Sequence, residues 1–277
     1  MKFDLFSSQS FRKHPIKFLC AKILMRLNLS KFFLINRKNY FLRFYPSSYS
    51  RALWIEPDFR LDQELFFQKY LKEGDKVIDI GANIGTITIV SAISVGSSGR
   101  VYSIEAHPKI FQFLRGNIKQ NKLTNVESFN FAVGSKSKTI FFTNFASDGQ
   151  NRVIDSISET KVSQVKIDDI GIKEFEINLI KIDVEGYEKF TFLGANDILN
   201  KTNCVLFEAV KRNYHNFGYD FVEIYDILNK YDFKIYRLLE NQTISLITRD
   251  YIPISEDLLA VKNIDDFICR TGYKIQN

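Results

Sequence analysis

Short apolar runs alternate with helical stretches through the middle of the chain. Runs of strand length cover residues 77–80, 100–105, 126–133, 177–183 and 203–209. Stretches between them or after them have helical periodicity, at 87–93, 108–120 and 221–231. This alternation is typical of right-handed βαβ units, and the runs 233–238 and 243–248 add an antiparallel hairpin. We therefore predict an α/β fold with a doubly wound, mostly parallel sheet and a C-terminal antiparallel hairpin.

Apolar positions also recur at helical spacing near the N-terminus. The predicted helix begins at Pro15, and its apolar positions are Ile16, Leu19, Cys20, Ile23, Leu24 and Leu27. Lys22 and Arg26 lie on the opposite side of the predicted helix. Such a helix either packs on the body of the protein with its charges in solvent, or lies on an anionic membrane surface. The pattern leaves both interpretations open.

These elements divide the chain into three predicted parts. Residues 1–70 form a basic N-terminal extension, 71–250 form the ligand-binding domain, and 251–277 form a C-terminal appendage. The end of the extension precedes the first core strand directly, so we expect it to pack over the mouth of the ligand site. The polar stretch 145–160 is a long loop, which serves either as a lid or acceptor-binding segment or as plain irregular structure.

The charge is concentrated at one end of the chain. The net charge is +6, but residues 1–45 hold ten Lys and Arg against the single acid Asp4, so this segment carries +9 and the remainder about −3. No apolar run approaches the ~20 residues of a membrane span. Cys20, Cys204 and Cys269 lack metal-ligand spacing. We expect a cytoplasmic protein without a cleaved signal, with peripheral membrane contact through the basic segment as an open alternative.

The first predicted strand runs into a glycine-containing turn, Asp79-Ile-Gly81-Ala82-Asn83-Ile-Gly85. Ligands bind open α/β sheets at the carboxyl ends of strands, and a glycine lets a ligand approach the backbone closely. The spacing is neither that of a dinucleotide-binding turn nor that of a phosphate-binding loop. An acid beside such a turn suits a ligand with a cationic end and a ribose. S-adenosylmethionine is such a ligand, with Asp79 and the backbone of 81–85 at its methionine end.

A second acid, Glu105, ends the next strand about twenty residues beyond the turn. This is where a Rossmann-like sheet presents a carboxylate to ribose hydroxyls. The backbone of Ala132 and Val133, after the third strand, is a candidate for contacting the adenine edge.

Further acids follow the later strands. Asp183 and Glu185 end the fourth strand, Glu208 lies near the end of the fifth, and His215 follows in a loop. Buried acids are costly unless they are paired or used. An alcohol acceptor needs a general base, for which these four residues are the candidates, and Asp183 also borders the cofactor turn. Nothing in the spacing demands a metal, so none is predicted, although Asp183 and Glu208 offer oxygen ligands to a divalent cation.

Taken together, these motifs resemble the FkbM family of methyltransferases over residues 75–210. The matching segments are Asp79-x-Gly81-Ala82-Asn83-x-Gly85, Val101-Tyr-Ser-Ile-Glu105-Ala-His-Pro108, Asn117, and Lys181-Ile-Asp-Val-Glu-Gly186 with Glu188. The resemblance implies a class I methyltransferase fold, S-adenosylmethionine as methyl donor, and a hydroxyl acceptor on a sugar, glycan or secondary metabolite. The family often has Glu-Pro at the end of strand two, whereas this chain has Glu105-Ala106 and keeps the carboxylate.

Three alternatives remain open at this level. A nucleic-acid methyltransferase could use the basic N-terminus on phosphates, but no recognition module or base-flipping motif follows it. A binding protein could keep the fold without catalysis. A nicotinamide oxidoreductase is disfavoured because the pyrophosphate-binding turn is missing. We expect an O-methyltransferase acting on a small molecule or glycan with a free hydroxyl, with no nucleic-acid partner; the oligomeric state is not predicted.

Overall fold

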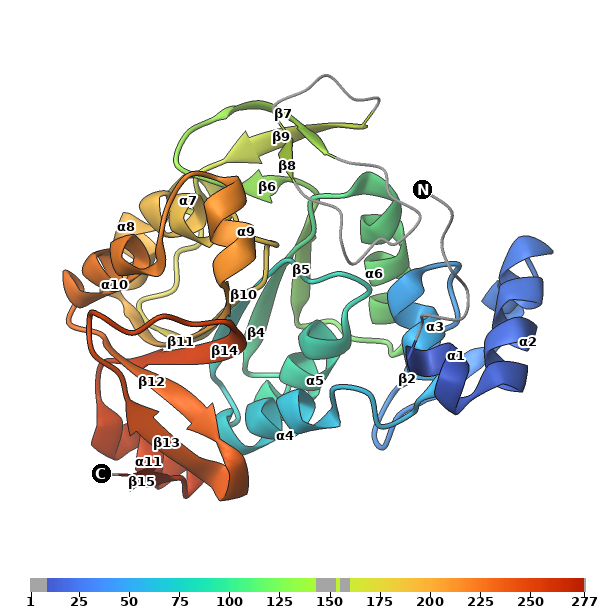
Figure 1. The fold of residues 1–277 in the computed structure, drawn as a ribbon, viewed down its shortest axis with the longest axis horizontal. Coiled ribbons are helices and arrows are strands. Elements are labelled where there is room, and N and C mark those ends of the chain that lie inside the picture. Colours follow the sequence, from blue (N-terminus) through green and yellow to red (C-terminus); the bar gives the residue numbers. More distant parts are fainter. Residues whose placement is uncertain (1–8, 143–152, 155–159, 277) are drawn as a thin grey trace.

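A nine-stranded sheet forms the centre of the molecule (Figure 1). The computed structural model describes residues 9–142, 153–154 and 160–276. From one edge to the other, the strands are β15 (Lys274–Gln276), β13 (Thr243–Leu246), β12 (Lys234–Leu239), β14 (Ser255–Val261), β11 (Thr202–Val210), β10 (Ile177–Ile182), β3 (Lys76–Ile80), β4 (Arg100–Ile104) and β5 (Val126–Phe129). The block from β11 to β5 is parallel, and all six residues of β10 are buried, as expected for a strand covered on both faces. The predicted doubly wound sheet and its C-terminal hairpin β12–β13 are confirmed.

Helices cover both faces of this sheet and enclose two apolar cores. One face carries α4 (Leu61–Tyr70), α5 (Thr86–Val95), α6 (Pro108–Gln120) and α11 (Ile264–Thr271). The other face carries α7 (Glu188–Leu193), α8 (Asn196–Asn200) and α10 (Phe221–Asn229), with α9 (Lys211–Asn216) after β11. The two cores hold the strand ends rigidly, so side chains that follow the strands are placed by well-packed elements.

The third predicted strand is shorter than expected. β5 ends at Phe129, where Asn130 donates its side-chain amide to the carbonyls of Glu105 and Ala106 at 2.9 and 3.0 Å. The chain then enters a second sheet of four strands: β6 (Ala132–Val133), β9 (Thr160–Val165), β7 (Lys138–Phe142) and β8 (Val153–Ile154). Figure 1 shows this small sheet at the top of the view. The predicted lid or acceptor-binding role of loop 145–160 falls mainly outside the described residues.

The C-terminal segment, which was expected to be an appendage, adds two strands to the main sheet, β14 and β15. β14 lies between β11 and β12, and seven of its residues pair with Cys204–Val210. α11 packs on α4, and Arg270 forms an ion pair with Asp75 at 2.7 Å. The order of strands along a chain does not determine their order in a sheet. The sequence pattern of the hairpin β12–β13 therefore could not show that the later strand β14 lies between it and β11.

The N-terminal extension forms α1 (Gln9–Lys13), α2 (Pro15–Arg26), a 3-10 turn η2 (Ser30–Phe32), a small hairpin of β1 (Leu34–Asn36) and β2 (Phe41–Arg43), and α3 (Ser48–Ile55). α2 packs against α3 with Phe18 and Ala21. Of the predicted apolar stripe, Leu24 packs on the core, but Ile16, Leu19, Ile23 and Leu27 are exposed. Among the described residues, no helix is long and apolar enough to cross a membrane.

Candidate active site

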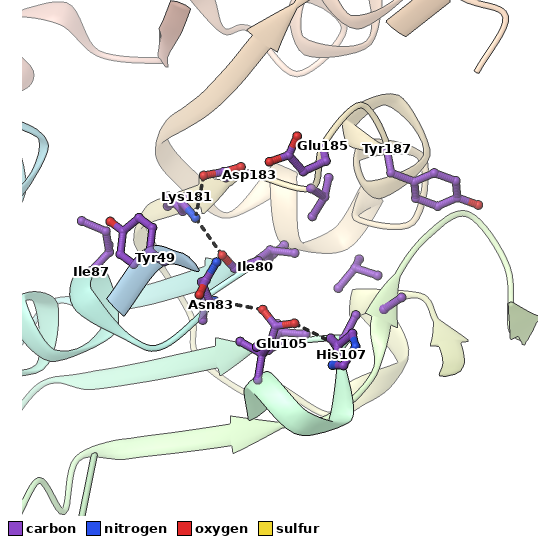
Figure 2. Close-up of a pocket in the computed structure, with 18 of the residues that line it drawn as sticks. Tyr49, Ile80, Asn83, Ile87, Glu105, His107, Lys181, Asp183, Glu185 and Tyr187 are labelled. Atoms are coloured by element: carbon purple, nitrogen blue, oxygen red, sulfur yellow. Dashed lines mark hydrogen bonds and ion pairs between the residues drawn. The ribbon is translucent and has the colours of Figure 1, made fainter. Parts of the chain in front are cut away.

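A pocket opens at the carboxyl ends of the central parallel strands (Figure 2). It has a volume of about 1030 Å³, counting the part that is open to solvent. Its walls come from the turn after β3, the ends of β4 and β10, the strand β6, and the N-terminal extension through Tyr49 and Arg60. The expectation that the extension lies at the mouth of the site agrees with these two residues. Pockets at this edge of a doubly wound sheet are where small ligands bind.

The turn after β3 is shaped by the strand beside it. Gly81 and Ala82 both donate their backbone N–H to the carbonyl of Ile104, at 2.9 and 3.0 Å. Gly81 has φ of +77°, and a Cβ placed on it would lie 1.8 Å from the carbonyl oxygen of Asp183. Only glycine fits here, because the ends of β3 and β10 touch through their backbones.

Glu105 ties this turn to the end of β4. Its carboxylate accepts the backbone N–H of Asn83 at 2.9 Å and that of His107 at 2.7 Å, as Figure 2 shows. Burial raises the pKa of Glu105 to about 7, although the two backbone hydrogen bonds oppose this rise. The carboxyl group therefore fixes two backbone turns and lies in the pocket wall at the same time.

The structure brings most of the predicted cofactor residues together. The pocket is lined by Gly81, Ala82, Asn83, Glu105, Ala132, Val133 and Asp183. Two others lie behind its lining. Asp79 is fully buried beneath the turn, and Gly85 begins α5 with its Cα facing Leu114, to which a Cβ would come within 2.6 Å. Asp79 therefore acts on the site through its neighbours and not as part of the pocket surface.

Lys181 is the main site residue that the sequence interpretation missed. Its ammonium lies 3.5 Å from Asp183 and 3.7 Å from Asp79, and it donates to the carbonyl of Gly81 at 2.9 Å. The second carboxylate oxygen of Asp79, Oδ2, accepts a hydrogen bond of 2.6 Å from the hydroxyl group of Thr88. One signal could have revealed it: Lys181 is the charged residue inside a strand that is buried at every position, and a buried lysine needs acidic partners.

These charged groups shift one another's pKa values. Burial disfavours charged Lys181, but Asp183 and Asp79 outweigh it and raise its pKa. Burial likewise opposes charged Asp183, but Lys181 and Arg60 lower its pKa. Arg60 lies 3.5 Å from Asp183, across the pocket mouth. Asp183 is therefore an anion held by two cations.

The turn after β10 places a second carboxyl group in the pocket. Glu185 and Gly186 have φ of +55° and +99°, and a Cβ on Gly186 would lie 2.8 Å from the carbonyl oxygen of Asn213. Glu188 holds the turn, because its carboxylate accepts the backbone N–H of Val184 at 3.1 Å and of Gly186 at 3.2 Å. Burial, followed by the charge of Asp183, raises the pKa of Glu185 to about 7.

Three predicted catalytic acids meet at this side of the pocket. Carboxylate oxygens of Asp183, Glu185 and Glu208 all lie within 4.8 Å of one another. Burial, and then the charges of Asp183 and Glu185, raise the pKa of Glu208. Such a group can hold a hard cation or share protons. Asp183 and Glu185 line the pocket, and Glu208 is not among its lining residues.

His215 does not join these acids. It lies on the exposed side of α9, and its Nε2 contacts the carboxylate of Asp220 at 2.8 Å. The expectation that it could act as the base is not supported by its position, because a base has to reach the proton that it removes.

Comparison with known proteins identifies the family. A model of the methyltransferase FkbM domain matches residues 79–235, which is more than half of the chain. The chain belongs to the FkbM methyltransferase family. The match includes the turn after β3, Glu105 and the Asp183–Glu188 region, so the predicted enzyme class and the methyl donor S-adenosylmethionine are confirmed at the level of the family.

Individual relatives are more distant. The hexuronic acid methyltransferase AglP of Haloferax volcanii is 27% identical over 163 residues, covering 56% of this chain and 65% of AglP. A probable cobalt-precorrin-6B C(15)-methyltransferase of Saccharolobus solfataricus is 42% identical over 55 residues, covering 20% of this chain and 28% of that protein. The matches thus span less than two thirds of these curated relatives. Among solved structures, a putative rRNA methylase from Clostridium thermocellum has a TM-score of 0.46 at 11% identity, covering 72% of this chain and 93% of that one.

The residues of the pocket fit S-adenosylmethionine. This molecule has a cationic methionine end, a ribose diol and a flat adenine ring. The pocket offers the anion Asp183, the carboxyl group of Glu105, and an apolar wall that contains Phe131 and Val133. The pocket therefore offers a group of suitable chemistry for each part of the donor.

Proposed function

We propose that this protein transfers a methyl group from S-adenosylmethionine to a hydroxyl group of a sugar or other glycan-like acceptor. One observation carries the proposal: the same pocket contains two features. The first is the turn at Gly81 with Glu105 beside it, and the second is the half-buried carboxyl group of Glu185, whose pKa is raised to about 7. The first suits the donor, and the second suits removal of a proton from an alcohol.

The donor would be held by the β3–β4 side of the pocket. Glu105 would accept hydrogen bonds from the ribose hydroxyls, the backbone of 81–83 with Asp183 would hold the methionine end, and the backbone of Ala132 and Val133 would contact adenine. When bound, the donor supplies an electrophilic methyl group on a sulfonium. The rigid turns of this chain would hold donor and acceptor in line, which replaces a bimolecular encounter by a fixed geometry.

Glu185 is the best general base among the predicted candidates. A base is most effective when its pKa lies near the working pH. The pKa of Asp183 is lowered by its two cations, which makes it a weak base, and Glu208 is not among the residues that line the pocket. Asp183 would instead keep Arg60 and Lys181 in place as a positioning residue.

A saccharide acceptor is favoured by two observations. AglP, by its name, methylates a hexuronic acid, and its match extends over 163 residues, or 56% of this chain. The pocket mouth also carries Arg60 and Gln63, which can donate hydrogen bonds to hydroxyl or carboxyl groups of a sugar.

Calorimetric titration with S-adenosylmethionine, S-adenosylhomocysteine and NAD tests the donor site. We expect both sulfur compounds to bind, NAD not to bind, and Glu105→Ala to weaken binding by roughly 10- to 100-fold through loss of hydrogen bonds to a charged group. Glu127→Ala, an exposed acid on β5, is the matched control and should bind normally. Binding of NAD alone, or of none of the three compounds, would contradict the proposal. If the donor binds, an assay for release of S-adenosylhomocysteine in the presence of uronic acids or hexoses identifies the acceptor.

A further inference from the structure

Helix α2 exposes a continuous apolar stripe to solvent. Its members are Ile16, Leu19, Ile23 and Leu27 at the end of the helix, with exposed fractions of 77, 46, 58 and 61%. They are spaced by three or four residues, so they lie on one side of the helix. Large apolar side chains scattered singly on a surface need no explanation, but an aligned row does.

The stripe is not needed to hold the helix on the protein. Phe18 and Ala21 are buried on the other side of α2, and the guanidinium of Arg51 on α3 lies 5.1 Å from the Phe18 ring centroid. The helix thus has two apolar sides, one that packs on α3 and one that faces solvent. Figure 1 shows α2 at the outer edge of the molecule, remote from the C-terminal strands.

Cations flank the stripe, and the stretch of sequence that contains it lacks acids. At about 100° per residue, Lys17 lies on one side of the stripe and Arg26 on the other. The ammonium of Lys22 lies instead 5.1 Å from the ring centroid of Phe18, on the packed side of the helix. The sequence from 9 to 45 contains no Asp or Glu. This surface is therefore positively charged at its edges and apolar along its middle.

The apolar surface continues in the turn that follows the helix. Phe32 is 71% exposed, and the ammonium of Lys31 lies 5.5 Å from its ring centroid. Leu29 and Phe33 are also exposed. An aromatic side chain with a lysine beside it repeats the combination found along α2.

We propose that α2 and the turn η2 dock on a lipid bilayer with anionic headgroups, with Ile16, Ile23, Leu27 and Phe32 inserted and Lys17 and Arg26 at the headgroups. Charge complementarity selects this occupant. An amphipathic helix lies in a membrane interface when an apolar face is bordered by cations, and anionic lipids attract those cations. Snorkelling lysine and arginine stems reach the headgroups from the edges of a buried stripe.

The stripe lies apart from the pocket. Tyr49 of α3 lines the pocket, whereas the stripe is on the side of α2 that faces away from α3. The proposal concerns binding to a membrane and does not depend on the methyl-transfer reaction, so either can fail without the other.

Vesicle flotation of the full chain tests the docking surface. We expect binding to an equimolar mixture of phosphatidylglycerol and phosphatidylcholine, and little binding to phosphatidylcholine alone. Replacing Ile16, Ile23 and Leu27 by serine should weaken binding on the order of a hundredfold or more. Reversing Lys17 and Arg26 to glutamate should weaken it about fivefold or more per lost cation.

Matched variants elsewhere on the surface serve as controls. Phe175→Ser with Ile252→Ser and Ile254→Ser also removes three exposed apolar side chains, and Lys234→Glu with Lys274→Glu makes the same charge change on exposed positions. Both should bind like the unchanged protein. Thermal unfolding should be the same for all variants, because every altered side chain is exposed.

A probe on the helix gives a second measurement that does not alter the stripe. Cys20 on α2 and Cys269 on α11 are both exposed, whereas Cys204 is buried. An environment-sensitive fluorophore on Cys20, in a Cys269→Ser background, should shift to the blue with anionic vesicles. The same fluorophore on Cys269, in a Cys20→Ser background, should not shift.

Three results would overturn the proposal. The first is failure of the full chain to float with anionic vesicles. The second is equal binding by the stripe variant and its control, which would make the attraction purely electrostatic. The third is a dimer in solution that the serine variant converts to a monomer without any vesicle binding, which would assign the stripe to a second copy of the chain.

Discussion

The two sides of the pocket are built on different principles. On the β3–β4 side, Gly81, Asn83 and Glu105 are connected through backbone hydrogen bonds, so this side has a fixed shape. On the β10–β11 side, Glu185 and Glu208 stand beside Asp183, and their protonation depends on one another. The first side therefore presents a backbone surface of fixed shape, whereas the charge of the second side depends on how neighbouring acids share protons.

Lys181 joins the two sides. It contacts the acid beneath the first turn, the carbonyl of Gly81, and the acid at the end of β10. Changes that separate the roles of the two sides, or that remove this link, test the comparison most directly.

The largest expected effect is on turnover. Glu185→Gln keeps the shape of the side chain but removes the base, so we expect kcat to fall by about 10²- to 10⁴-fold while donor affinity stays within about twofold. Stopped assays of methyl transfer together with donor titration measure both. Glu208→Gln and His215→Ala serve as comparisons and should lose much less activity; a larger loss in Glu208→Gln would move the base to that residue.

Removing the link should cost stability. Lys181→Met keeps the length of the side chain but leaves Asp79 and Asp183 without their buried cation, and breaking a buried pair in this way costs about 3–5 kcal/mol. Chemical denaturation measures the free energy of unfolding. Lys234→Met on the exposed face of β12 should change it little, and equal stability of the two variants would show that Lys181 is not essential to the charge balance.

A smaller effect should appear in the pH dependence of stability. Burial raises the pKa of Glu188 to about 8, so the folded state binds a proton that the unfolded state releases above about pH 4.5. The stabilising contribution is complete below that value and is lost as the pH rises towards 8, at about 1.4 kcal/mol per unit. In Glu188→Gln, the unfolding free energy should fall less steeply between pH 5 and 8. The slope should decrease by up to the value for one bound proton, about 1.4 kcal/mol per pH unit. An unchanged slope would show that Glu188 is ionised in the folded protein.

Much of the β3–β4 side could be predicted from the sequence. Gly81 follows one predicted strand, and Glu105 ends the next. Because the carboxyl ends of parallel strands lie at the same edge of a sheet, these two residues are expected near each other whatever the rest of the fold. The acids of the β10 side were predicted for the same reason. Asp79 was recognised as important, but its depth below the pocket depends on how the turn folds over it.

Other features follow from contacts between distant segments. The place of β14 between β11 and β12, the end of β5 at Phe129, and the partners of Lys181 all involve residues that are far apart in the chain. The direction of the α2 stripe is of the same kind, because periodicity identifies an apolar side but does not say whether the protein covers it. Local patterns determined the elements and the residues at their ends, since these depend on neighbours in the chain; tertiary structure decided burial, pairing and exposure, since these depend on what packs against them.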